Sequence, residues 1–412
     1  MSTPLQSVRV LVVFCLVGTG WAFSFGLSAP LASLWLSDAG YHVDVVGLNT
    51  GVYYLGIVAT AIAAPWLMRR MGRACPILGF VLSAATVMLF PWGDGLFGWF
   101  VLRLVNGIGG AMSLIPLETY VNRHSPPQQR SRNFGFYAVA IAVGWALGNL
   151  IGLPMYDGAA RSAFLLGGGV TLLALPLLWL ALPWPAEPTA QRDEWVSLPW
   201  RRSLLGFGSG WGQGFLEGSM VSLLPIYLLF LKLSKDEVSW LTSGIMIGVI
   251  LFQVPVAWLA DRLGRARVLL ACHAVVLAGL IALPFCTGRL ALPICLFFVG
   301  ACSGAFYPLG LSLLGEQVSN AALARASACY LALNCLGSLV GPIVTGVVMR
   351  YYGNATMPVS GIAAGVLVLA VWLIFREHPA PANATMRCVY RDPRDAAGSR
   401  YPGFTPSISD DS

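Results

Sequence analysis

Charged side chains are scarce in this sequence. Only 10% of its 412 residues are Asp, Glu, Lys or Arg, whereas 57% are hydrophobic. An ordinary soluble domain is roughly a quarter charged. Because so few charges cannot cover a globular surface in water, lipid must be the main solvent of the chain. The composition predicts a membrane protein.

Metal-binding and catalytic motifs are absent as well. The nine cysteines form no CxxC pair and no cluster with histidine at metal-ligand spacing, and most of them lie inside apolar runs. The four histidines belong to no HExxH motif, and no P-loop GxxxxGK[ST] occurs. We therefore expect no metal, no cofactor, no enzymatic activity and no ATP-driven pumping. The net charge of +7 is spread over short loops, which argues against nucleic-acid binding.

Long apolar runs fill most of the chain. A membrane-spanning helix needs about 20 mainly apolar residues. Twelve stretches meet this criterion, namely 9–31, 46–67, 75–93, 96–120, 133–154, 162–183, 203–231, 239–259, 267–287, 290–314, 325–349 and 357–376. The sequence therefore predicts an all-α membrane protein with about 12 transmembrane helices.

The basic residues between these runs are unevenly distributed. If both ends of the chain face the cytoplasm, that side receives 19 Lys and Arg residues and the other side receives five. Cytoplasmic loops of membrane proteins are enriched in Lys and Arg. The asymmetry predicts an N-in/C-in orientation and an even number of spans.

An internal repeat divides the chain into two halves. The stretch PWLMRRMGRA at Pro65–Ala74 recurs as AWLADRLGRA at Ala257–Ala266, with six of ten positions identical at an offset of 192. Further matches follow in order at offsets of 192 and 193: Pro116 with Pro308, Arg132 with Arg325, Tyr137 with Tyr330, Gly144 with Gly337 and Gly148 with Gly341. Gly18–Trp21 also matches Gly208–Trp211, at an offset of 190. Ordered matches at nearly one offset indicate two six-helix halves of like topology.

A Pro-rich, charged segment separates the halves. We expect an N-terminal six-helix half at 1–183, a cytoplasmic linker at 184–202, a C-terminal six-helix half at 203–376 and a disordered cytoplasmic tail at 377–412.

The repeated Arg/Gly turn resembles the GxxxDRxGRR/K signature of the major facilitator superfamily. The second copy keeps Asp261, Arg262, Gly264 and Arg265, and the first keeps Arg70, Gly72 and Arg73 but has Arg69 in place of the acid. Arg103 and the glycines that follow Asn106 resemble the family's RxxxGxG motif, and the glycines at 144, 148 and 152 resemble its antiporter-type pattern. The resemblance covers nearly the whole chain.

Three stretches resemble more narrowly the YcaD-like bacterial permeases, most of which lack an assigned substrate: Leu117–Asn122, Glu217–Pro225 and Gly300–Gly315. The resemblance implies a monomeric transporter of the bacterial inner membrane that carries a small molecule by alternating access. It leaves the cargo open, because drugs, sugars, small peptides and other metabolites all occur in the family.

Two charged residues inside the spans are the main functional candidates. Glu217 lies about 14 residues into its run, near the bilayer midplane at 1.5 Å per residue. We expect it to couple protons or bind substrate; the alternative is a structural carboxylate hydrogen-bonded to Ser or Tyr. Arg103 is implied by the resemblance to lie at the cavity lip, and the alternative is snorkelling to the outer interface. The hypothesis is that both residues border one central cavity.

Further polar residues could line this cavity, although each is more often a local hydrogen-bonding residue. They are Asn106, Gln213, Ser222, Tyr227, Gln253, Tyr307 and Asn334. Of the tryptophans, Trp21 and Trp211 are the ones expected to reach a cavity, and others, Trp145 among them, are read as interface markers.

A second group is expected to form a cytoplasmic latch that holds the halves together when the site faces outward. Its members are Arg70, Gly72, Arg73, Glu118, Arg132, Asp261, Arg262, Gly264, Arg265, Glu316 and Arg325. The alternative for the arginines is orientation alone, which requires no acid such as Asp261.

The leading interpretation is a secondary transporter of a small molecule, with protons as the coupling ion. The antiporter-like glycine pattern favours export of a drug or metabolite. The alternatives are an importer of a sugar, peptide or other metabolite, and a non-transporting sensor of the same fold.

Overall fold

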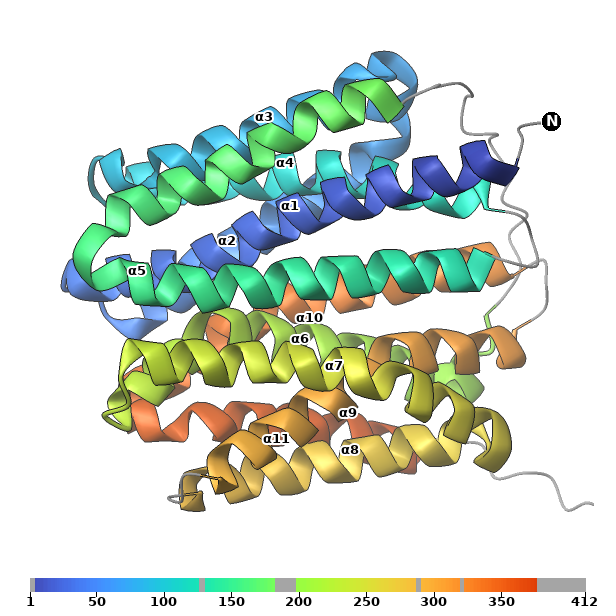
Figure 1. Ribbon diagram of the computed structural model, residues 1–412. Coiled ribbons are helices and arrows are strands. Elements are labelled where there is room, and N and C mark those ends of the chain that lie inside the picture. Colours follow the sequence, from blue (N-terminus) through green and yellow to red (C-terminus); the bar gives the residue numbers. More distant parts are fainter. Residues whose placement is uncertain (1–3, 126–129, 182–197, 287–289, 319–321, 376–412) are drawn as a thin grey trace, which may run out of the picture. The chain divides into compact units, whose positions relative to one another are not determined.

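The computed structural model describes residues 4–125, 130–181, 198–286, 290–318 and 322–375 (Figure 1). These residues are almost entirely helical, which confirms the all-α fold. The α-helices are α1 (Pro4–Asp38), α2 (Val43–Met71), α3 (Ala74–Leu89), α4 (Gly95–His124), α5 (Arg130–Ala181), α6 (Trp200–Phe230), α7 (Lys235–Leu263), α8 (Arg265–Ala282), α9 (Ala291–Gln317), α10 (Leu323–Tyr352) and α11 (Met357–Phe375). Short 3-10 turns η1 (Phe90–Trp92), η3 (Leu283–Phe285) and η4 (Asn354–Thr356) extend three of the connections.

Eleven helices in the described part of the chain are long and apolar enough to cross a membrane. One of them, α5, has 52 residues. At about 1.5 Å per residue it would be about 78 Å long if straight, more than twice the hydrocarbon thickness of a bilayer. The backbone leaves helical geometry at Ala159 (φ −154°, ψ 45°), where α5 turns back on itself (Figure 1). The fifth and sixth predicted spans are thus the two arms of α5.

The expected linker and tail lie mostly outside the described residues. The structure describes the end of the linker, where α6 begins at Trp200, three residues earlier than expected. We refer to α1–α5 as the N-terminal half and to α6–α11 as the C-terminal half.

Both copies of the Arg/Gly turn place a glycine at positive φ directly after a helix, although ψ differs, at −122° for Gly72 and 133° for Gly264. Gly72 follows α2 with φ 51°, and Gly264 follows α7 with φ 94°. Glycine reaches positive φ without the steric penalty of a Cβ, so it ends a helix readily. Each glycine amide donates to a carbonyl four residues back, that of Met68 at 3.0 Å and that of Ala260 at 2.9 Å. We call the end of the bundle that holds both turns the Arg-rich end, and the other the opposite end.

Equivalent glycines bring equivalent helices together in the two halves. An added Cβ at Gly148 of α5 would lie 2.2 Å from the carbonyl oxygen of Phe23 in α1. An added Cβ at Gly341 of α10 would lie 2.2 Å from the carbonyl oxygen of Phe215 in α6. Such contact leaves no room for a side chain, so small residues permit the backbones to approach. The repeat in the sequence is therefore also a repeat in packing.

The structure corrects the alignment of the first helix of each half. Gly18 lies against Tyr137 and Gly210 lies against Tyr330, with an added Cβ 2.9 Å and 2.8 Å from the respective ring. Gly18 thus corresponds to Gly210, at an offset of 192, and its predicted match with Gly208 is wrong by two residues. Both helices carry several closely spaced glycines, so letter identity alone favours more than one register.

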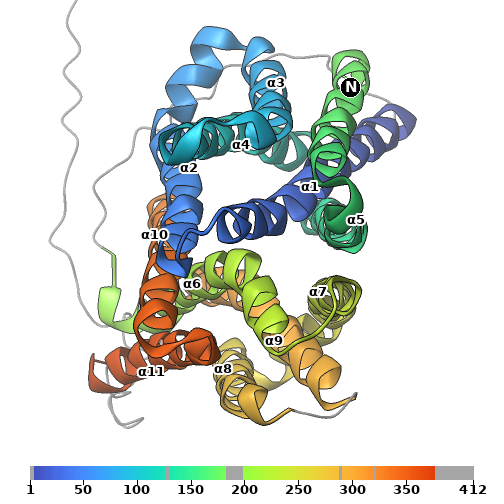
Figure 2. The ribbon, with the colours of Figure 1, turned by 90° about the vertical axis from the view of Figure 1, so that its left-hand side faces the viewer.

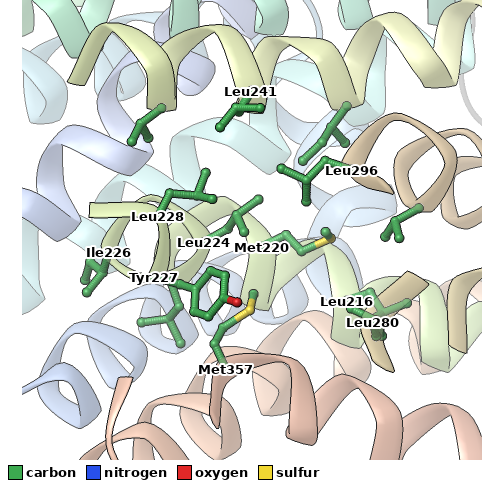
Figure 3. Close-up of a cluster of buried hydrophobic side chains, with 14 of the residues drawn as sticks. Leu216, Met220, Leu224, Ile226, Tyr227, Leu228, Leu241, Leu280, Leu296 and Met357 are labelled. Atoms are coloured by element: carbon green, nitrogen blue, oxygen red, sulfur yellow. The ribbon is translucent and has the colours of Figure 1, made fainter. Parts of the chain in front are cut away.

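At one end of the bundle, buried apolar side chains of the two halves pack into one cluster. At the other end, each half has a cluster of its own. The largest cluster contains residues of both halves, such as Leu31 of α1 and Leu224 of α6, and Figure 3 shows its C-terminal part. Its N-terminal-half members lie towards the opposite end. Two further clusters lie towards the Arg-rich end: one has its buried members in the N-terminal half, around Phe14, and the other in the C-terminal half, around Tyr330.

Polar contacts also join the halves at the opposite end, along two seams that flank α1 and α6 (Figure 2). In the first seam, between α2 and α10, Arg350 forms an ion pair with Asp44 at 2.6 Å. In the second, between α5 and α7, Lys235 forms an ion pair with Asp157, and the Ser239 hydroxyl donates to a backbone carbonyl of α5 at 3.0 Å. Both ion pairs lie away from the arginine turns.

Candidate functional site

A cavity of about 210 Å³ lies where the first arm of α5 faces α6, α7 and α9. It is therefore bordered by both halves. Most of its lining is apolar, with Met220, Ile245 and Met246 among the contributing side chains. Glu217 and Gln213 supply a polar wall from α6.

Glu217 lies at one end of a short hydrogen-bond chain. The Gln213 side-chain amide donates to its carboxylate at 2.6 Å, one helical turn away. The Asn334 amide of α10 donates in turn to the Gln213 oxygen and, at 3.0 Å, to the carbonyl of Gly210. A buried carboxylate is costly unless it is hydrogen-bonded or paired. The chain orients Glu217 and supplies it with a neutral donor.

The hydroxyl groups in the cavity wall already donate to their own helices. Thr242 donates to the carbonyl of Val238 at 2.9 Å, and Ser303 donates to that of Gly300 at 3.2 Å. Such bonds satisfy the hydroxyl within one helix. The carboxylate is thus the strongest acceptor that the wall offers to a ligand.

Several predicted cavity residues are placed elsewhere by the structure. Ser222 is buried and donates to the Gly218 carbonyl at 3.1 Å, and Tyr227 is buried in the apolar cluster of Figure 3. Tyr307 packs edge-on against the Tyr330 ring, with centroids 5.2 Å apart. Gln253 lies in α7 beyond the residues that line the cavity. Asn334 reaches the site through Gln213.

Arg103 lies in a separate pocket. It is 3% exposed, its guanidinium carbon lies 5.1 Å from the centroid of the Tyr53 ring, and its Nε atom has no hydrogen-bond partner. It shares a small pocket with Asn106, whose amide donates to the Thr86 hydroxyl at 2.9 Å. Arg103 and Glu217 do not line the same cavity, although both lie within electrostatic reach of Tyr53.

The C-terminal arginine turn forms a cluster inside its own half. Arg265 pairs with Glu316 of α9 at 3.0 Å and also donates to the Ser312 carbonyl at 3.0 Å. Asp261 lies 3.8 Å from the same guanidinium, and Arg262 stacks on Trp258 at 3.8 Å. These contacts tie α7 and α8 to α9.

The N-terminal turn is arranged differently. Arg70 stacks on Trp66 at 5.5 Å, and Arg69 and Arg73 are exposed. Glu118 of α4 is partly buried and lies within electrostatic reach of Tyr307 in the other half. The remaining latch candidates are less informative: Arg325 lies in the first turn of α10, and the side chain of Arg132 lies outside the described residues. The latch itself stays a prediction.

Trp145 is a cavity residue that the sequence interpretation missed. It lines the cavity from α5, and its ring packs edge-on against Phe25 at 5.2 Å. The expectation that only Trp21 and Trp211 reach a cavity is therefore wrong, and Trp211 does not line this one. Asn149 and Thr242 also line it, where α5 and α7 meet. The Gly144–Gly148 spacing, which sets the face that α5 turns to α1, is the sequence signal that could have placed Trp145.

Metal binding finds no support in the described residues, since no group of three His, Cys, Asp or Glu side chains there is placed to hold an ion.

Two alike halves of membrane-crossing helices, with a partly polar cavity between them, are the architecture of a secondary membrane transporter. The family model of the Major Facilitator Superfamily matches residues 10–230 and 203–392. The chain belongs to this family, and it is a membrane transporter and not an enzyme.

Relatives confirm the resemblance to the YcaD-like group. The chain is 27% identical over 352 residues to the uncharacterized MFS-type transporter YfkF of Bacillus subtilis, covering 81% of this chain and 87% of that one. It is 27% identical over 358 residues to the uncharacterized MFS-type transporter YcaD of Escherichia coli K12, covering 86% and 92%.

Solved structures share the fold. A bacterial homologue of the human lysosomal transporter Spinster, in an inward-facing and occupied conformation, aligns with a TM-score of 0.72 at 15% identity over 92% of this chain and 100% of that one. A D-xylose–proton symporter aligns with a TM-score of 0.72 at 16% identity over 90% and 98%. At these identities the likeness shows the fold alone.

Proposed function

We propose that this protein is a proton-coupled secondary transporter that exports a small molecule, with Glu217 as the proton acceptor. The observation that carries the proposal is the place of Glu217: its carboxylate lines a cavity bordered by both halves, midway along α6. An ionisable group inside the membrane is expensive and therefore functional by default.

Protonation of Glu217 would be coupled to cargo transport because it changes the charge of the cavity. The carboxylate has a neutral partner in Gln213, so the proton removes a charge that no cation among the described residues offsets at hydrogen-bond distance. A group whose charge changes in a low-dielectric cavity alters the free energy of the conformation that holds it. The two halves are expected to rock about the cavity, with residues 1–183 and 203–376 as the moving units.

The Arg-rich end is expected to face the cytoplasm, which gives the N-in/C-in orientation in the bacterial inner membrane. The distribution of Lys and Arg, 19 against five, supports this orientation. Shared apolar packing and ion pairs at the opposite end support a closed outer side in this conformation. The Spinster homologue, whose conformation is inward-facing, is consistent with this interpretation.

Proton coupling is tested in proteoliposomes. A pH gradient should drive cargo flux through the unaltered protein, and cargo should drive proton flux, measured with a pH-sensitive dye against a panel of drugs and metabolites. Glu217→Gln should abolish both fluxes while leaving folded protein in the membrane. The matched control Asp236→Asn, the same chemical change at an exposed position of α7, should leave both fluxes intact.

Three other outcomes would contradict the proposal. Unchanged coupling in Glu217→Gln would remove this residue from the mechanism. Cargo uptake in the direction of proton entry would make the protein an importer. Absence of any flux with cargo that demonstrably binds would favour a sensor.

A further inference from the structure

The cavity contains an acid and no cation. Glu217 is the one ionisable side chain among the residues that line it. Arg103, which the sequence allowed as a second wall of the same cavity, lies in its own pocket against Tyr53. A site with one carboxylate and no basic partner in its wall attracts cations and repels anions.

None of the residues that the structure describes supplies Glu217 with a counter-charge at contact distance. Its hydrogen-bond donor is the neutral amide of Gln213, at 2.6 Å. The titratable groups that face it from the neighbouring helices are the hydroxyls of Tyr53 and Tyr54 in α2, that of Tyr307 in α9 and the thiol of Cys335 in α10, all neutral when protonated. Arg103 and Glu217 each lie within electrostatic reach of these two α2 tyrosines, and Arg103 lies in its own pocket. An ionised carboxylate in this cavity would therefore be stabilised by a mobile cation that binds beside it.

The rest of the wall suits an apolar body of modest size. Val221 and Leu224 of α6 and Ile245 of α7 supply branched aliphatic surface, and Met220 and Met246 supply flexible thioethers that adapt to varied shapes. The indole of Trp145 adds an aromatic wall able to hold a cation against its face. Pockets for drug-sized ligands measure roughly 300–1,000 Å³, so a cavity of about 210 Å³ suits a single ring with a short substituent.

Resting on the proposed function, we propose that the cargo is a small hydrophobic monocation: its positive group pairs with Glu217 and its apolar body lies between Trp145 and the methionine-rich wall. Proton and cargo then compete for one carboxylate. Anionic metabolites are disfavoured, since the wall carries a carboxylate and none of its side chains is positively charged.

The test measures binding, not transport. Purified protein in lipid nanodiscs is titrated by equilibrium dialysis with benzyltrimethylammonium and with neopentylbenzene, its neutral isostere with carbon in place of nitrogen. Phenylacetate serves as the anionic probe, and empty nanodiscs correct for partitioning into lipid. The cation should bind at least about tenfold more tightly than the isostere, and phenylacetate should not bind. Cation binding should weaken as the pH falls, because protonated Glu217 has no charge to offer.

Three variants locate the effect, and a fourth is a control. Glu217→Gln should bind cation and isostere equally, whereas Glu217→Asp, which keeps the charge, should retain the preference. Trp145→Leu should weaken both the cation and the isostere. Asp236→Asn should change nothing and controls for loss of a carboxylate elsewhere.

Equal affinity for cation and isostere in the unaltered protein, tighter binding of phenylacetate, or a cation preference that survives in Glu217→Gln would each overturn the cargo class. None of these results bears on whether Glu217 carries a coupled proton. If the charge preference fails but Glu217→Gln still abolishes proton-driven flux, the proposed function stands alone. If the protein prefers the cation but shows no proton flux, the proposed cargo class is supported and the proposed proton coupling is contradicted.

Discussion

The two halves of the bundle pack alike and are charged differently. Gly148 and Gly341 hold equivalent helix pairs at the same spacing, yet the position equivalent to Glu217 is Phe25, in an aromatic cluster with Trp21. Gly107 of α4 meets the Tyr53 carbonyl as Gly300 of α9 meets that of Ile245, an offset of 193 at this level, so the position equivalent to Arg103 is Leu296, buried in the largest apolar cluster. Duplication thus preserved the contacts that build each half, whereas the charges that could do chemistry occur once each.

Shared packing predicts the largest effect. Gly148→Val and Gly341→Val should both abolish folded protein, because each new side chain would meet a backbone carbonyl where even a Cβ lies 2.2 Å away. Gly169→Val, at a glycine of α5 with open space around it, should be tolerated. Size-exclusion chromatography of fluorescently tagged protein measures the yield. If one variant of the pair folds normally, the halves do not share this contact.

The presence of Arg103 in one half only predicts the second largest effect, on proton-driven flux. Arg103→Met should reduce proton-driven flux at least about tenfold with little change in melting temperature, since an apolar side chain of similar length replaces a buried guanidinium whose Nε has no hydrogen-bond partner. Leu296→Met makes the matched change in the other half, and volume-conserving swaps cost less than about 1.5 kcal/mol. Flux should survive there. Normal flux in Arg103→Met would make Arg103 structural.

The seams between the halves predict a smaller effect. Asp44→Asn and Asp157→Asn each remove one ion pair at the opposite end. Exposed pairs contribute about 0.2–1 kcal/mol, so each variant should shift the balance of conformations by up to about fivefold. Distances between spin labels on α2 and α10 report that balance. An unchanged distance distribution in the double variant would mean that apolar packing alone closes this end.

The two arginine turns predict the smallest effect. Asp261→Arg should lower flux by about twofold, because Arg265 loses a partner at 3.8 Å but keeps Glu316 at 3.0 Å. Arg69→Asp should have no effect, since Arg69 is exposed. Flux in proteoliposomes, normalised to protein content, measures both. Equal losses would show that the turns share one role despite their different charges.

Much of the fold was predictable because lipid imposes a strong constraint on sequence. Apolar runs showed where the spans lie, and glycines and prolines occur within them and between them. The sequence could not show that the fifth and sixth spans form one helical segment bent at Ala159, because a hydropathy pattern reports spans and not the backbone between them.

The site was predictable in part. Glu217 could be singled out because a carboxylate inside a membrane-spanning run is energetically costly and usually functional. Trp145 did not stand out, since its place in the wall depends on how α5 meets α6 and α7. The separation of Arg103 from Glu217 was also hidden, because it depends on Tyr53, a third residue on a third helix.

The bend in α5 joins two arms that pack in different parts of the N-terminal half. Its first arm borders the cavity and the seam with α7, and its second arm packs against α3, where Gly168 lies beside Met88. A single residue, Ala159, joins the arms, so there is no loop to absorb rotation. We therefore expect a tilt of the first arm, at the cavity, to be transmitted to the second arm, at α3, so that the two arms move together.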